Sequence, residues 1–454
     1  MHHKCIQEIK MDILNLPKFN ILSISENEND FLIQVVTNSP PLACPHCGCK
    51  ANLYKHGNRE HVCMDLPIHG KRVGLLIKRQ RYRCRECSQT FWERLDHTID
   101  AKRNCTKRLL SYVEKQSLNR TFVSISEDVG LNEKTIRNIF RDYINHLEET
   151  FRFVTPNWLG IDEIHIIKPR CVLTNIEERT LLDILPNRNK ETVVGYLSRL
   201  PNKGRIQYFT MDMWKPYKDA VKAVLPKATI IVDKFHVVRM ANQALETIRK
   251  QLREGLSPTE RRGFMHDRFI LLKRHKELTE MDKITLDLWT KNHPTLGIAY
   301  NLKESFFDIW DCDSRQKAFI KYNDWKAQIP KELQSAFEPL TKAMMNWDEE
   351  IFAYFDHRIT NAYTESLNSL IRVINRLGRG YSFKALRAKI LFTEGLVKDH
   401  KPKYQKRMDD YELRDYNFPM FENMPPVGVV RERGEQLRGI DISTLIEKLE
   451  KGEL

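Results

Sequence analysis

Two cysteine pairs near the N-terminus constrain the fold of this chain more than any other feature. The sequences CPHC and CREC carry Cys44, Cys47, Cys84 and Cys87 on two knuckles. Four thiolates in this arrangement suit the tetrahedral coordination that zinc prefers in closed, structural sites. The segment between the pairs is longer than in the commonest pattern, so it must fold back to bring the knuckles together. The sequence therefore predicts a zinc ribbon with these four cysteines as ligands.

Other residues near the knuckles leave two points open. Cys49 and Cys63 could replace individual ligands, and buried cysteines without a metal are the simpler alternative to zinc. The doubled CxxC favours metal binding in a reducing compartment over a disulfide framework. Basic side chains around Tyr82 indicate phosphate contacts or, alternatively, a solvated basic face. They are Lys71, Arg72, Lys78, Arg79, Arg81, Arg83 and Arg85.

The length and the charge of the chain point to several domains and a polyanionic partner. The 454 residues include 74 Lys plus Arg against 60 Asp plus Glu, a net charge of +14. Such an excess favours nucleic acid, although an anionic membrane surface is the other possibility. The first residues lack a continuous apolar segment, and no later apolar run approaches the roughly 18 residues of a membrane span. We therefore expect a cytoplasmic protein.

The segment TFVSISEDVGLNEKTIRNIFRDYINHL is typical of a helix-turn-helix. A short helix ends at Gly130, and Asn132 can cap the next helix. The apolar side chains of that second helix recur with the spacing of a single buried face. The opposite face carries Lys134, Asn138 and Arg141, which are residue types that contact phosphates and base edges in a major groove. Any amphipathic helix pair shows the same periodicity, but the position directly after a basic ribbon favours DNA binding.

An alternation of strands and helices follows from about residue 157. The stretch LGIDEIHI reads as a buried strand that contains Asp162, and an ionised acid inside a sheet is costly unless a cation or hydrogen bonds compensate it. Two more strands form a meander, and later strands end at Asp212 and Asp233. Right-handed crossovers place these later strands parallel to the first, with their carboxyl ends on one edge. This is the order of the RNase H-like fold.

A helix in the C-terminal half offers a third acid for that edge. Glu365 lies in the first turns of this helix, and Asn361 precedes it by four residues on the same face. Two or three carboxylates around a point can hold two Mg²⁺ ions about 4 Å apart for phosphodiester chemistry. Taken singly, each acid has an ordinary structural explanation, as a helix cap, a strand end or a solvated charge. Their joint placement favours a catalytic site.

The chain resembles the DDE-type insertion-sequence transposases of the ISL-three group over most of its length. The resemblance rests on the CPHC and CREC knuckles, GIDEIHI, PKATIIVDKFHVVRMANQAL and NAYTESLNSLIRVINRLGRGYSFKALRAKI. It implies binding to the terminal inverted repeats of an element and Mg-dependent cleavage and strand transfer into target DNA. It also implies that Asp162, Asp212 and Glu365 form the catalytic triad and bind magnesium, with Asp233 and His236 beside them. A homodimer on double-stranded DNA and association with the bacterial nucleoid are further expectations.

Topology decides which aspartate we predict as the second catalytic one. The strand that ends at Asp212 lies next to the first strand, whereas the strand that ends at Asp233 lies one position further out. We therefore expect Asp212 to bind the metals and Asp233, with His236, to orient a ligand or the scissile phosphate.

A basic segment after the third acid is a further candidate for DNA contact. Arg376 and Arg379 follow Glu365 within a few turns, and Gly378 and Gly380 would let the backbone approach a phosphate closely. A solvated basic helix is the alternative.

The predicted fold is a multidomain α+β chain with an N-terminal zinc ribbon and helix-turn-helix, followed by an RNase H-like α/β catalytic core with a helical insertion. Two other functions fit the motifs: a non-catalytic DNA-binding regulator, and an RNase H-like nuclease that cuts without joining. The expected segments are an N-terminal strand segment (1–43), the zinc ribbon (44–100), the helix-turn-helix (101–150), the first part of the core (151–250), the helical insertion (251–350), the Glu-bearing helix (351–400) and a C-terminal tail (401–454) with a last short helix, STLIEKLEKGEL.

Overall fold

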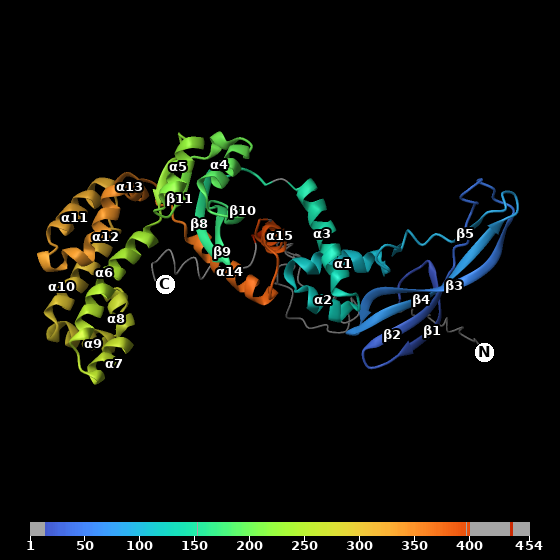
Figure 1. The fold of residues 1–454 in the computed structure, drawn as a ribbon, viewed down its shortest axis with the longest axis horizontal. Coiled ribbons are helices and arrows are strands. Elements are labelled where there is room, and N and C mark those ends of the chain that lie inside the picture. Colours follow the sequence, from blue (N-terminus) through green and yellow to red (C-terminus); the bar gives the residue numbers. More distant parts are fainter. Residues whose placement is uncertain (1–13, 152, 396, 400–435, 439–454) are drawn as a thin grey trace, which may run out of the picture. The chain divides into compact units, whose positions relative to one another are not determined.

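The chain forms two compact units, residues 1–152 and 153–454 (Figure 1). The computed structural model describes residues 14–151, 153–395, 397–399 and 436–438. Most of the predicted C-terminal tail, including its last short helix, lies outside these residues. From the tail, only β14 (Gln436–Arg438) is described, and it pairs antiparallel with β13 (Val397–Asp399).

A seven-stranded sheet organises the first unit, in the order β1-β2-β4-β3-β7-β6 with β5 paired to β4. The alternating pattern of the N-terminal residues produces β2, whose buried side chains Phe31, Ile33 and Val35 face those of β4 in a parallel pair. The predicted N-terminal strand segment and the ribbon therefore share one sheet and one core. The strands are β1 (Phe19–Glu26), β2 (Asp30–Thr37), β3 (Leu53–Ile68), β4 (Lys71–Cys84), β5 (Thr90–Trp92), β6 (Ile99–Asp100) and β7 (Cys105–Thr106).

Three helices complete this unit: α1 (Lys107–Asn119), α2 (Phe122–Val129) and α3 (Glu133–Thr150). The predicted turn is confirmed, because α2 ends at Gly130 in the left-handed conformation and the Asn132 side chain accepts a hydrogen bond at the start of α3. A Cβ on Gly130 would come within 2.7 Å of Met64 and would strain a backbone at φ +71°. Glycine therefore permits both the turn and the packing of the helices on β3 and β4.

The second unit contains the predicted five-stranded sheet, in the order β10-β9-β8-β11-β12. The strands are β8 (Trp158–Ile166), β9 (Lys168–Asn175), β10 (Thr180–Leu185), β11 (Tyr208–Met211) and β12 (Thr229–Val232). The meander β8-β9-β10 is antiparallel, whereas β8, β11 and β12 run parallel. The carboxyl ends of the parallel strands thus lie at one edge, and the predicted RNase H-like order is confirmed.

Helices cover both faces of this sheet (Figure 1). Leu159 and Ile161 of β8 share a hydrophobic cluster with residues of α4 (Lys190–Arg199) and α5 (Lys215–Val224). On the other face, α14 (Ala362–Gly378) contacts β8 and β9, and α15 (Phe383–Glu394) contacts β10. The helix α14, which is distant from β8 in the sequence, therefore packs on the strand that carries Asp162.

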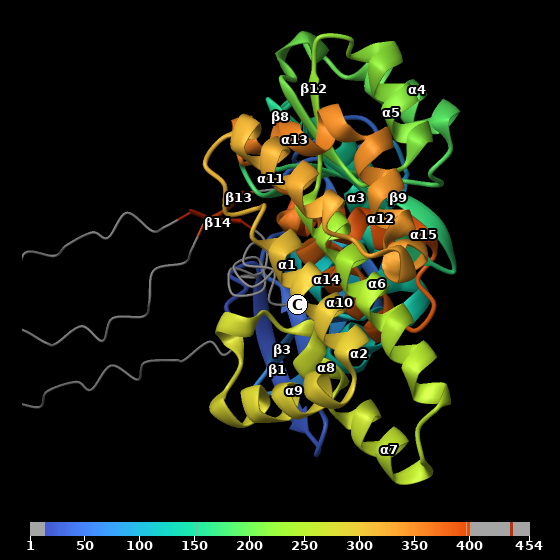
Figure 2. The same ribbon diagram turned by 90° about the vertical axis from the view of Figure 1, so that its left-hand side faces the viewer.

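A helical insertion separates β12 from α14. It begins along α6 (Lys234–Glu254), which packs on α10 and α12 (Figure 2). The other helices of the insertion are α7 (Pro258–His266), α8 (Arg268–Leu272), α9 (Glu280–Asn292), α10 (Pro294–Phe307), α11 (Arg315–Ala327), α12 (Gln334–Asn346) and α13 (Asp348–His357), with short 3₁₀ turns at His275–Glu277 and Lys331–Leu333. A further 3₁₀ turn, Lys203–Arg205, precedes β11.

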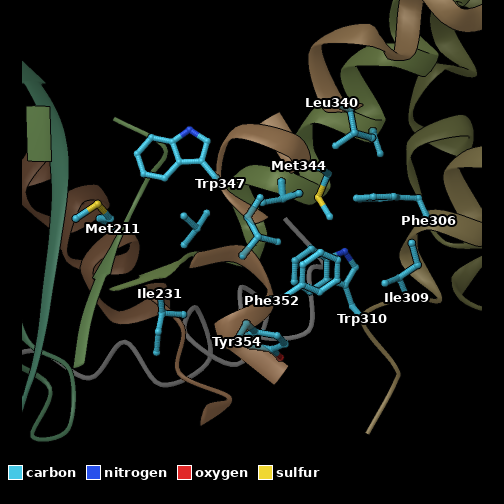
Figure 3. Close-up of a cluster of buried hydrophobic side chains, with 14 of the residues drawn as sticks. Met211, Ile231, Phe306, Ile309, Trp310, Leu340, Met344, Trp347, Phe352 and Tyr354 are labelled. Carbon is cyan, nitrogen blue, oxygen red and sulfur yellow. The ribbon is translucent and has the colours of Figure 1, made fainter. Parts of the chain in front are cut away.

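The insertion shares its core with the five-stranded sheet. Figure 3 shows Met211 and Ile231 of the sheet near Trp347, beside the aromatic side chains of the insertion. Trp310 stacks on Phe355 with ring centroids 5.5 Å apart. Since one hydrophobic cluster runs from the sheet into the helices, the insertion and the sheet are packed as a single body. Among the described residues, no helix is long and apolar enough to cross a membrane.

Candidate functional site

The four predicted zinc ligands come together in the first unit. Cys44 Sγ lies 3.6 Å from Cys87 Sγ, and Cys47 Sγ lies 3.7 Å from Cys84 Sγ. All four sulfurs lie within 4.8 Å of one another. Sulfurs bound tetrahedrally at 2.3 Å from a zinc ion stand about 3.8 Å apart. The geometry therefore fits a closed zinc site made of these four residues.

The two knuckles are built alike. Cys44 N donates to Cys49 O at 2.8 Å, and Cys84 N donates to Gln89 O at 3.0 Å. The residue after the second cysteine has a positive φ in both knuckles, 76° at Gly48 and 57° at Ser88. Burial opposes ionisation of Cys44, but hydrogen bonds from the backbone of Cys47 and His46 lower its pKa to about 7. Burial and the neighbouring sulfurs instead raise the pKa of Cys47, to about 12, and that of Cys87, so the four sulfurs do not all ionise without a cation. A thiolate is the form that binds zinc.

The two alternative ligands lie outside this group of sulfurs. Cys63 is fully buried in the hydrophobic cluster of the N-terminal sheet, and its thiol lies 3.6 Å from the carbonyl oxygen of Met64. Cys49 stays within its knuckle, where its carbonyl oxygen rather than its sulfur contacts Cys44.

Five side chains gather at the carboxyl edge of the second sheet. Asp162 is in β8, Asp212 directly follows β11, and Asp233 directly follows β12. His236 lies in the first turn of α6 and Glu365 in the first turn of α14. Two groups of potential metal ligands result, one with Asp162, Asp212 and His236, and one with Asp233, His236 and Glu365. We call these five residues the acid cluster.

His236 is common to both groups. Its Nδ1 lies 3.6 Å from Glu365 Oε1 and 3.9 Å from Asp233 Oδ2. Among the described residues, Asp212 Oδ1, Asp233 Oδ2 and His236 Nδ1 are buried and have no hydrogen-bond partner. Buried polar atoms of this kind are costly unless a ligand or ion compensates them. Since carboxylate oxygens are the ligands that Mg²⁺ prefers, the residues present fit magnesium.

The electrostatics of the acid cluster favour a bound cation. Burial raises the pKa of Asp162 to about 7 and that of Glu365 to about 9. Burial also raises the pKa of Asp212 and of Asp233, and the charge of His236 acts in the opposite direction on all three aspartates. The charges of Asp233 and Asp162 add to the shift at Glu365. Carboxylates this close cannot all ionise without added positive charge.

Asn361 is buried at the start of α14 and connects this helix to the sheet by hydrogen bonds. Its Nδ2 donates to Ile161 O at 3.1 Å, and its Oδ1 accepts from Thr364 at 2.6 Å and from Thr210 at 3.1 Å. A Cβ on Gly160 would come within 2.5 Å of this Oδ1. The missing side chain at residue 160 therefore allows α14 to approach β8.

Asn368 is a site residue that the sequence reading missed. It is buried, and its Nδ2 donates to Asp162 Oδ2 at 2.7 Å, while the backbone N–H of Glu163 donates to Asp162 Oδ1 at 2.7 Å. Both oxygens of Asp162 are thus oriented. The only sequence signal was the spacing of Asn368, three residues after Glu365 on the same helix face.

Arg188, which lies beside the acid cluster, is a second residue that the sequence reading missed. Glu163, the neighbour of Asp162, forms an ion pair with Arg188. The Arg188 guanidinium lies 4.4 Å from the ring centroid of Trp214, which is 37% exposed. Arg188 thus places a positive charge near Asp212, where it opposes the rise in pKa caused by burial.

The predicted DNA-contacting residues are accessible. In α3, Lys134 and Arg141 are exposed and Asn138 is half-buried, opposite the buried Ile136 and Phe140. Arg376 near the end of α14 and Arg379 at its C-cap are exposed as well. Both groups therefore remain available to a ligand.

Family models match three successive parts of the chain. The model of the transposase family ISL3, DDE type, matches residues 159–390. The model described as zinc-finger of transposase IS204/IS1001/IS1096/IS1165 matches residues 40–87, and the model described as helix-turn-helix domain of transposase family ISL3 matches residues 93–144.

Individual relatives agree with these matches. The transposase for insertion sequence element IS1001 of Bordetella parapertussis is 24% identical over 351 residues, which cover 75% of this chain and 85% of the relative. The transposase for insertion sequence element IS1557 of Mycobacterium tuberculosis is 25% identical over 283 residues, which cover 55% of this chain and 62% of the relative.

Proposed function

Since this chain belongs to the DDE transposases of the ISL3 family, we propose that it binds the terminal inverted repeats of an insertion sequence and catalyses magnesium-dependent cleavage and strand transfer of DNA. The observation that carries the proposal is the acid cluster at the edge of the parallel strands, with buried carboxylate oxygens that lack partners. We further expect two copies to act on the two ends of the element.

We assign Asp162, Asp212 and Glu365 as the magnesium ligands. When bound, two Mg²⁺ ions supply activation of the attacking water or hydroxyl and stabilisation of the leaving oxygen. Asn368 fixes the orientation of Asp162 through its 2.7 Å hydrogen bond. His236 belongs to both groups of ligands and lies next to Glu365 and Asp233, and in its charged form it would offset their negative charge.

The proposed DNA interface has two parts. In the first unit, Lys134, Asn138 and Arg141 of α3 read the element ends, as in other helix-turn-helix proteins. In the second unit, Arg376 and Arg379 hold the DNA near the scissile bond. The charge of Arg372, two turns after Glu365 on the same helix, opposes the rise in pKa that burial causes at that acid, which supports a basic helix that starts at the acid cluster.

A strand-transfer assay tests the proposal. The protein is incubated with Mg²⁺, a DNA that carries the ends of its own element and a target plasmid, and cleaved and joined products are measured. The proposal expects both products, and Asp212→Asn should abolish both while end binding remains. Asp287→Asn is a matched control, because Asp287 is an exposed aspartate of α9 that pairs with Lys291.

The two alternative functions give other results in the same assay. A DNA-binding regulator would bind the ends and yield no cleavage with any divalent cation. A nuclease would yield cleavage without joined product. Either result would contradict the proposed transposase activity.

A further inference from the structure

Three arginines surround one tryptophan on the ribbon of the first unit. The guanidinium carbons of Arg59, Arg79 and Arg81 lie 4.5, 5.9 and 5.7 Å from the ring centroid of Trp92. We call these four residues the arginine cluster. Cation–π contacts of this kind hold guanidinium groups in fixed positions.

Strand register places the arginine cluster on one face of the sheet. Arg59 of β3 pairs directly with Arg79 of β4, and Arg81 of β4 pairs directly with Trp92 of β5. Because side chains alternate along a strand, residues 79 and 81 point to the same side. Tyr82 faces the other side, where it stacks on Phe91.

The positive charges of the arginine cluster exceed the negative charge beside them within the described part of the chain. Arg79 donates to the carbonyl oxygen of Glu93 at 2.8 Å, and Arg81 donates to Thr90 Oγ1 at 2.6 Å. Neither of them, nor the exposed Arg59, forms an ion pair among the described residues. Other arginines of this unit do, since Arg72 pairs with Asp30 and Arg108 pairs with Asp65.

This arrangement costs stability unless an anion binds to it. Like charges directly opposite each other on neighbouring strands are destabilising. Burial and the nearby charge of Arg59 lower the pKa of Arg79, and the charge of Glu93 opposes this shift only in part. The indole ring and the hydrogen bonds therefore hold in place three guanidinium groups beside a single carboxylate, Glu93, so that a net positive charge remains for an external anion.

We infer that the arginine cluster binds phosphate groups of the DNA backbone and anchors the ribbon to DNA without reading its sequence. Guanidinium groups bind phosphate oxygens in a bidentate geometry, which suits a phosphodiester backbone. The inference rests on the proposed DNA binding and adds a contact outside the helix-turn-helix. Base reading is then left to α3, whereas the arginine cluster adds affinity that is equal for all sequences.

Salt titration of DNA binding tests the inference. The zinc-loaded full chain is titrated with duplex DNA of random sequence at several salt concentrations, and the slope of log K against log salt is compared between variants. Arg59→Ala should reduce the slope by about 0.9, the value for one lost phosphate contact. Arg59→Lys should restore the slope, because it keeps the charge. Lys115→Ala serves as the matched control, since Lys115 is exposed on α1, forms no ion pair among the described residues and lies outside the arginine cluster.

Each outcome has one meaning. An unchanged slope for Arg59→Ala, with zinc content equal to that of the wild type, would overturn the inference while the proposed function stands. Equal losses for Arg59→Ala and Lys115→Ala would also overturn it, because they would indicate a diffuse basic surface. A flat salt dependence of the wild-type protein would instead contradict the proposed DNA binding itself.

Discussion

The two units contain candidate metal sites of opposite character. The cysteine site of the first unit consists of two short knuckles, and its sulfurs already lie at zinc-binding separations. The acid cluster of the second unit draws on β8, α6, α14 and the loops after β11 and β12, and burial raises the pKa of all its carboxyl groups. The cysteine site thus follows from the spacing within each CxxC pair, whereas the acid cluster depends on tertiary folding that brings mutually repelling groups together.

The largest expected effect is the loss of the zinc site. Cys47→Ser should remove zinc and abolish DNA binding, since structural zinc contributes about 10–16 kcal/mol of binding free energy in zinc-finger peptides. Zinc content and DNA affinity are the measurements. Cys49→Ser is the matched control and should retain both, because Cys49 Sγ is not one of the four clustered sulfurs. Loss of zinc in the control would show that the ligand set is wrong.

The cleavage rates of single Asp→Asn variants should differ between Asp212 and Asp233 of the acid cluster. Asp212→Asn is expected to lower the cleavage rate by about a thousandfold or more, on the scale of losing a preorganised electrostatic group. Asp233→Asn should leave weak activity, because β12 lies one strand further from β8 than β11 does. Both variants should keep zinc and end binding. The reverse ranking in a cleavage assay would overturn the assigned triad.

The contact between α14 and the sheet is expected to be sensitive to a single methyl group. Gly160→Ala places a Cβ within 2.5 Å of both Asn361 Oδ1 and Ile176 Cδ1, so overpacking should cost about 1–3 kcal/mol. Cleavage should fall as well, because α14 carries Glu365. Gly195→Ala in α4 is the control, since nothing lies within 4 Å of its Cβ. Equal changes in the melting temperature of the two variants would refute this account of Gly160.

The smallest expected effect has the opposite sign. In the absence of divalent cations, Asp212→Asn should stabilise the protein by about 1–2 kcal/mol, because it removes a charge that burial disfavours. Burial raises the pKa of Asp212 in the folded state. The stability that protonated Asp212 contributes is therefore lost as the pH rises above the pKa of an unfolded aspartate, about 3.9. The gain from Asn should therefore grow with pH across that window. Melting temperatures over a pH series check this, and a gain that shrinks with pH would contradict it.

Sequence reasoning succeeded where local chemistry decides structure. The helix-turn-helix followed from the Gly130 turn and the Asn132 cap, and the strand order of the second sheet followed from connection rules. The parallel pairing of β2 with β4 was not predicted, because it joins strands separated by the knuckle and β3. Such a pairing leaves no mark in the local pattern of either strand.

The supports of the acid cluster could not be predicted for a related reason. Asn368 binds Asp162 across 206 residues of sequence, and Arg188 approaches Trp214 only because α4 and α5 are neighbours. Asn361 was noted as a neighbour of Glu365 on one helix face, but its hydrogen bond to Ile161 O depends on the close approach at Gly160. Periodicity identifies a helix face, and it does not identify what that face contacts.

The separation of Asp162 from Asn368 also sets an order of events during synthesis. A ribosome adds about 5–20 residues per second, so the 206 residues between these partners take roughly 10–40 s to appear. The cysteine knuckles and all of α3 precede Asp162 in the chain. A nascent or truncated chain that stops before α14 therefore carries its zinc and helix-turn-helix elements together with an incomplete acid cluster, and it would compete for DNA ends without cutting them.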